Sequence, residues 1–188
     1  MEFNAEKFYK KVFGGKCGYQ ILKKNNEYAQ MGATGTLWEI NKFATTGRTQ
    51  IYVSEKYMGE DLPHMQLEIY KADGVPGWSI DDDEVAYYFY VGNKYVYQVR
   101  SCWLFLLAER IKDFVDENTN IQKWMTTIKR SGSKNIKFIT NFGVPSLPTE
   151  IEIELKCERN NNSLKVLANV DWKQCMNKLK MDIEKLKL

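Results

Sequence analysis

The feature that most constrains this sequence is a pair of aromatic and β-branched stretches, Val85–Val91 and Lys94–Val99, separated only by Gly92-Asn93. Valine, tyrosine and phenylalanine are enriched in β-strands. A Gly-Asn pair is typical of the tight turn between two antiparallel strands. The sequence therefore predicts a β-hairpin, and at least part of the chain must form a sheet.

Alternation of apolar and polar residues predicts further strands on both sides of this hairpin. The expected strands are Thr49–Ser54, Met65–Tyr70, Lys137–Thr140, Ile151–Cys157 and Ser163–Val170. Glu55–Asp61 is expected to form a polar turn between the first two, and Gly74–Gly77 a loop. The last two strands are expected to pair as a hairpin around the turn Asn160–Asn162.

Apolar residues at helical spacing, together with capping residues, predict the helices. The expected helices are 3–13, capped by Asn4; Leu37–Ala44, with Thr36 as cap and Glu39 at capping-box spacing; Trp103–Val115, preceded by Ser101; Ile121–Lys129; and a final helix that begins at Asp171 and includes Leu186. Residues 17–33 favour neither helix nor strand.

These elements predict a mixed α/β chain of the α+β class, with a central mixed β-sheet flanked by helices. A length of 188 residues suits a single domain, 1–188. The alternative is a core over 1–136 with a C-terminal extension, 137–188, made of a β-hairpin and a helix.

Composition excludes several classes of protein. No apolar run approaches the ~20 residues that span a bilayer, and the acidic N-terminus lacks the apolar region of a secretory signal. We therefore expect a cytoplasmic protein without a membrane partner. The cysteines are far apart and form no CxxC pair, so reduced thiols are expected at Cys17, Cys102, Cys157 and Cys175.

Several reaction types also lack their residues. The chain has no Walker A motif and no GxGxxG. A catalytic triad would have to use the single histidine, His64, which has no nucleophile elbow nearby. A surface or hydrogen-bonded histidine is the simpler interpretation.

The distribution of charge indicates an anionic partner. The net charge is +3, and the stretch between Ile121 and Lys137 contains bases but no acid. These candidate nucleic-acid-binding residues are Lys123, Lys129, Arg130, Lys134 and Lys137. Lysine and arginine beside glycine and serine suit contact with phosphate groups. The alternative is a solvated loop.

Carboxylates and a lysine around the strand Met65–Tyr70 suit hydrolysis of phosphodiester bonds. The candidates are Glu39, Asp61, Glu68 and Lys71. A divalent cation on oxygen ligands activates water and stabilises the developing charge on phosphate. Each acid also has a structural interpretation: Glu39 as a capping residue, Asp61 as a turn former, and Glu68 as an exposed strand residue.

In these residues the chain resembles the PD-(D/E)XK nuclease superfamily, which includes restriction enzymes and Holliday-junction resolvases. The resemblance covers about residues 36–115 and depends on the strand Leu67-Glu68-Ile69-Tyr70-Lys71-Ala72-Asp73 and the loop Pro76-Gly77-Trp78-Ser79-Ile80. It implies a restriction-endonuclease-like core and a metal-dependent endonuclease acting on double-stranded or branched DNA. It further implies Mg²⁺ or Mn²⁺ on Asp61 and Glu68, support from Glu39, and a water-orienting role for Lys71.

Two departures separate the chain from the family pattern. The family spacing is Glu-x-Lys, whereas here it is Glu68-x-x-Lys71, so the two side chains share a face only if a β-bulge lies between them. Gln50 stands where the first metal-binding aspartate is expected. The alternative function is therefore a non-catalytic DNA- or protein-binding accessory protein, encoded by a phage or plasmid, with a protein partner or a second copy. A phage-encoded protein would work in the host cytoplasm.

Overall fold

The computed structural model describes residues 4–12, 17–22, 34–40, 48–72, 74–81, 85–141, 148–160 and 163–188. The predicted α+β class is confirmed, because helices and two sheets are both present. The chain divides into two compact units. Unit 1 comprises Met1–Leu62, Asp82–Ser101 and Ile183–Leu188, and unit 2 comprises Pro63–Asp81 and Cys102–Asp182.

Unit 1 is built on a six-stranded sheet with the order β1-β2-β3-β6-β7-β11. Its elements are α1 (Ala5–Val12), β1 (Cys17–Ile21), β2 (Gly35–Ile40), β3 (Arg48–Tyr57), β6 (Val85–Val91), β7 (Tyr95–Arg100) and β11 (Ile183–Lys187). All neighbours pair antiparallel except β3 and β6, which are parallel. The predicted β6–β7 hairpin is confirmed, with Val91 opposite Val96 across the turn.

Helix α1 supplies one side of the unit 1 core. The Asn4 side chain caps it by accepting the Lys7 N–H at 2.9 Å, as predicted. Phe8 and Tyr9 are buried against the sheet, where their rings meet Phe89 edge-on at 6.5 and 5.0 Å between centroids. This aromatic packing fixes the first helix on the face of the sheet that carries Val53, Val91 and Val96.

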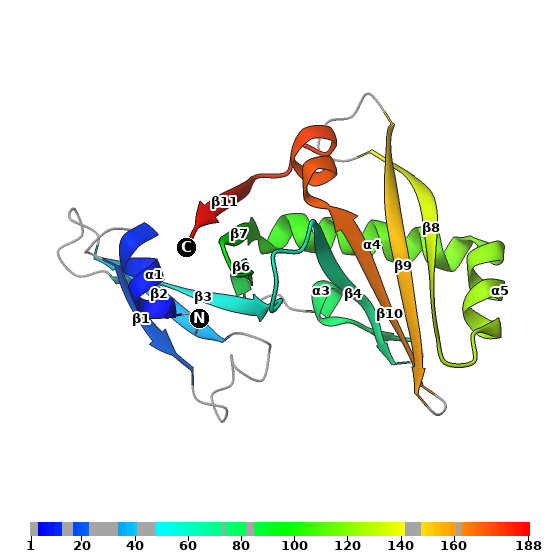
Figure 1. Ribbon diagram of the computed structural model, residues 1–188, viewed down its shortest axis with the longest axis horizontal. Helices are drawn as coiled ribbons and strands as arrows, with labels where there is room; N and C mark the ends of the chain where they lie inside the picture. Colours follow the sequence, from blue (N-terminus) through cyan, green and yellow to red (C-terminus); the bar gives the residue numbers. More distant parts are fainter. Residues whose placement is uncertain are drawn as a thin grey trace. The chain divides into compact units, whose positions relative to one another are not determined.

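Unit 2 is built on a five-stranded antiparallel sheet with the order β5-β4-β10-β9-β8. Its elements are β4 (His64–Ala72), β5 (Val75–Pro76), α3 (Trp78–Asp81), α4 (Ser101–Glu117), α5 (Thr119–Thr127), β8 (Ser131–Thr140), β9 (Thr149–Asn160), β10 (Ser163–Asp171) and the π-helix η1 (Gln174–Lys178). Helix α4 lies along one face of the sheet (Figure 1). Its stripe of Leu104, Leu107, Ala108, Ile111 and Val115 is buried.

Three predicted elements are wrong. The helix expected at Leu37–Ala44 is replaced over its described part by strand β2, which pairs with both β1 and β3. The polar turn expected at Glu55–Asp61 begins only after Tyr57, because Glu55 lies buried inside β3. The loop expected at Gly74–Gly77 contains the short strand β5.

The predicted final helix is also wrong beyond its first turns. The Asp171 carboxylate does accept the Gln174 N–H at 3.0 Å. The helical segment then ends at Leu179, and Lys180 adopts a left-handed backbone with φ 55°. The following residues form β11, because they find hydrogen-bonding partners on the edge of β7. No helix in the described part of the chain has the length and apolar character needed to span a bilayer.

Candidate functional site

The predicted site residues lie in different parts of the chain. Glu39 is on β2 in unit 1, and its side chain is outside the described part of the structure. Asp61 also belongs to unit 1, whereas Glu68 and Lys71 belong to unit 2. Among the described residues, no group of three or more histidine, cysteine or acidic side chains could hold a metal ion.

The Asp61 carboxylate closes the turn of the β6–β7 hairpin. Its Oδ1 accepts the backbone N–H groups of Lys94 at 2.9 Å and Tyr95 at 3.2 Å. The pKa of Asp61 is lowered from its ordinary value, and the main cause is the hydrogen bond from the Lys94 backbone N–H. This geometry is that of a turn-forming aspartate, which was one of the two interpretations of Asp61.

Glu68 sits in a more enclosed environment on β4. Its Oε1 lies 2.9 Å from the Lys165 Nζ, and its Oε2 accepts the Trp78 N–H at 3.3 Å. Glu68 is 9% exposed, whereas the Lys165 side chain is 43% exposed, so water reaches this ion pair from the lysine side. Gly77 is required beside it, since a Cβ at that position would lie 1.9 Å from the Glu68 carbonyl oxygen.

Two irregularities interrupt the pairing of β4 around Lys71. Glu68 is opposite Leu167 on β10, but Tyr70 is opposite Val166, so Ile69 is an extra residue in the pairing. Tyr70 thereby turns toward helix α4, where its hydroxyl donates to Asp116. A second shift lies at Lys71, because Tyr70 is opposite Pro76 on β5 but Ala72 is opposite Val75. A bulge between Glu68 and Lys71 is what the Glu-x-x-Lys spacing requires if both side chains are to share a face.

The predicted nucleic-acid-binding residues separate into two groups. All five side chains are exposed. Lys123 lies on α5, Lys129 and Arg130 in the following turn, and Lys134 at the start of β8. Lys137 is an odd number of residues from Lys134 along β8, hence on the other face of the sheet, and its Nζ lies 3.1 Å from Glu150.

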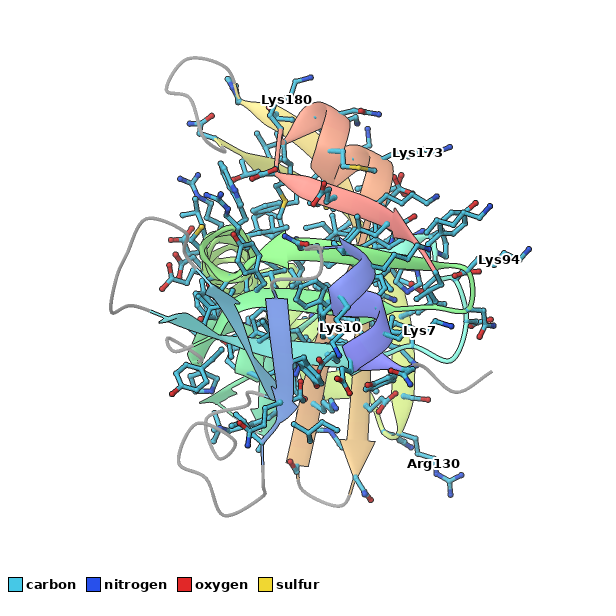
Figure 2. The ribbon with its side chains drawn as sticks, turned by 90° about the vertical axis from the view of Figure 1, so that its left-hand side faces the viewer. Lys7, Lys10, Lys94, Arg130, Lys173 and Lys180 are labelled. Carbon is cyan, nitrogen blue, oxygen red and sulfur yellow. The ribbon has the colours of Figure 1, made fainter. Side chains whose placement is uncertain are left out.

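The first group forms what we call the α5–β8 basic surface: Lys123, Lys129, Arg130 and Lys134. The Lys134 Nζ lies 6.0 Å from the centroid of the half-buried Trp124 ring. The Arg130 side chain extends away from the backbone (Figure 2). Arg159 holds the turn, because its backbone N–H donates to the Arg130 carbonyl and its Nε donates to the Ile128 carbonyl at 3.1 Å.

Sequence reasoning missed Trp124, Lys165 and Arg159. Trp124 lies within the predicted basic stretch, so its position in the sequence was a usable signal. Lys165 and Arg159 reach their partners only across strand pairings with β4 and β8, and nothing local in the sequence marks those contacts. Comparison of the chain with protein-family models, curated proteins and solved structures finds no match.

Proposed function

We propose that this chain binds nucleic acid through the α5–β8 basic surface of unit 2. The observation that carries the proposal is the Lys134 ammonium beside the half-buried Trp124 ring, within a stretch that contains bases and no acid. Basic side chains neutralise phosphates and release counterions. An aromatic ring next to them offers a surface on which a base can stack.

The proposal is tested by measuring binding of single-stranded, double-stranded and branched DNA and of RNA by fluorescence anisotropy, over a series of salt concentrations. Replacing Arg130 and Lys134 together by glutamine should weaken binding. It should also reduce the slope of log affinity against log salt by about one for each phosphate group that the variant no longer neutralises.

Lys137→Gln is the matched control. It removes a positive charge from the same strand, but from the other face, where that charge is already paired with Glu150. The control should bind with nearly the affinity of the natural chain. Failure of the natural chain to bind any of the four ligands, or an equal fall in affinity in the control, contradicts the proposal.

A second candidate function is metal-dependent hydrolysis of DNA at Glu68 and Lys71, as the resemblance to the PD-(D/E)XK superfamily implies. The observation that favours it is the β4 bulge at Ile69, because Glu68 and Lys71 can share a face only if a bulge lies between them. The described residues place Lys165 beside Glu68, and none of them forms a group of three or more histidine, cysteine or acidic side chains there. Magnesium or manganese binding stays a prediction.

The test is cleavage of linear, nicked, branched and single-stranded DNA, and of RNA, with magnesium, manganese or EDTA. Under this second proposal, cleavage requires the metal and disappears in Glu68→Gln. Glu154→Gln alters another glutamate on the same face of the sheet, where Glu154 accepts a hydrogen bond from Asn169 at 2.9 Å. This control should keep full activity. If no substrate is cleaved with either metal, the hydrolysis proposal is wrong and only the nucleic-acid-binding proposal remains.

A further inference from the structure

A groove in unit 1 lies outside both proposed sites. It has a volume of about 680 Å³, which falls within the size range of small-molecule sites. Its main lining residues are Asn4, Glu6, Tyr19, Gln20, Ile21 and Tyr57. Ile21 is 72% exposed and Tyr57 is 61% exposed, so the groove offers apolar and aromatic surface that a ligand could cover.

A buried carboxylate lies behind one wall of this groove. The Glu55 carboxylate accepts hydrogen bonds from the hydroxyls of Tyr9 at 2.8 Å, Thr34 and Tyr19. Glu55 is 5% exposed. Its known partners in the described structure are hydroxyl groups, which carry no positive charge. Burial raises the pKa of Glu55, so its role at the groove is to hold the Tyr19 hydroxyl in place rather than to supply charge.

The position of Tyr19 between groove and carboxylate depends on Gly35. A Cβ at residue 35 would lie 2.3 Å from the Tyr19 ring. The ring consequently lies flat over β2, the strand that pairs with its own strand. One side of the phenol faces the groove, and its hydroxyl bonds to Glu55.

The groove also has an acidic rim. Glu6 lies in the first turn of α1, where its charge offsets the positive end of the helix dipole. Its ion pair with Lys10 is exposed on both sides, so it is weak. Among the described residues that line the groove, none is basic.

We propose that this groove binds an organic ammonium group, held by the Tyr19 and Tyr57 rings and by the carboxylate of Glu6. Aromatic faces attract cations through the ring quadrupole, and quaternary ammonium groups are recognised in this way by clustered tyrosines. The apolar Ile21 side chain suits the alkyl part of such a ligand. A free amine and a lysine side chain of another protein share this chemistry.

The experiment is titration of the full chain with choline, with its uncharged isostere 3,3-dimethylbutan-1-ol, and with a trimethyllysine peptide, followed by NMR. Choline should bind at millimolar concentration, and the uncharged isostere should bind about tenfold more weakly. If the peptide binds more tightly than choline, the ammonium group that the groove recognises comes from a protein side chain. Tighter binding of choline identifies a free amine.

The variant is Tyr57→Leu, with Tyr95→Leu as the control on the same sheet. Because the Tyr57 ring is largely exposed, its removal leaves the fold intact, and choline binding should fall about threefold to tenfold. The control, whose ring already lies 3.9 Å from the Lys185 ammonium, should bind as the natural chain does. The proposal is overturned if choline and the isostere bind with equal affinity, or if Tyr57→Leu binds choline as tightly as the natural chain does.

Discussion

At Glu55, three hydroxyl groups surround a carboxylate that burial has removed from water. Burial raises the pKa of Glu55 above its ordinary value, although the hydrogen bonds from Tyr9 and Tyr19 act in the opposite direction. The folded chain therefore holds a proton at pH values where the unfolded chain has released it. Stability is highest below the ordinary glutamate pKa and falls as pH rises toward the raised pKa.

Glu55→Gln should remove this fall in stability with rising pH, because an amide side chain has no proton to release in that pH range. We expect the free energy of unfolding of the variant, relative to the natural chain, to increase from about pH 4 to about pH 8. Urea unfolding at a series of pH values measures it. A difference that stays constant across the series would contradict the assignment.

Glu6→Gln provides the control for this pH dependence. The hydrogen bond and charge of Lys10 lower the pKa of Glu6, so its linkage has the opposite sign. The Glu6 variant should gain no stability relative to the natural chain as pH rises.

The role of Glu55 could not have been predicted from its neighbours in sequence. A glutamate followed by Lys56 and a polar stretch is typical of a turn, and a turn was expected there. Its partners are residues 9, 19 and 34, which approach only when α1 and β1 assemble on the sheet. By contrast, the turn-forming role of Asp61 was among the predicted alternatives, because its partners lie in one hairpin.

At the scale of elements, local patterns predicted the structure well where pairing partners are near in sequence. The β6–β7 and β9–β10 hairpins, α1, α4 and α5 all form close to their expected positions. Strand β2 shows the opposite case. Its capping-box spacing favours a helix, but antiparallel pairing on both edges satisfies its backbone instead.

Helix α5 presents the basic surface, so its N-terminal cap affects both stability and binding. The Asn118 side chain accepts the Ile121 N–H at 3.1 Å. Asn118→Ala should destabilise the chain by about 1 kcal/mol, because that N–H is left without its side-chain acceptor. Thermal unfolding followed by circular dichroism measures the change.

Asn120→Ala is the matched control for this cap. Asn120 is an exposed residue inside the same helix, where alanine is favoured. Its replacement should leave stability unchanged or slightly increased. If both variants are destabilised equally, the cap is not the cause.

At the scale of the whole molecule, neither unit is a continuous piece of chain. The backbone passes between the units after Leu62, Asp81, Ser101 and Asp182. The sequence favours a single domain, 1–188, with a division after residue 136 as the alternative. The observed division follows pairings that are distant in sequence, above all that of β11 with β7.

Removal of residues 183–188 should therefore weaken unit 1, which begins far from them in sequence. The deletion takes away the strand paired with β7 and the Leu186 side chain that packs on the unit 1 core. Hydrogen exchange should become faster at β7 amides and stay unchanged in the β9–β10 hairpin of unit 2. A Glu184→Ala variant, which keeps the strand, should exchange as the natural chain does. Unaltered protection of β7 after the deletion would contradict this.

The return of β11 to unit 1 also fixes an order of events during synthesis. All residues of unit 2 precede Ile183 in the chain, so a ribosome has translated them before it makes the last strand of unit 1. Domains usually fold during translation in the order in which they are made. Here the unit that is started first is completed last, and until then the newly made chain exposes the β7 edge to the chaperones of the cell.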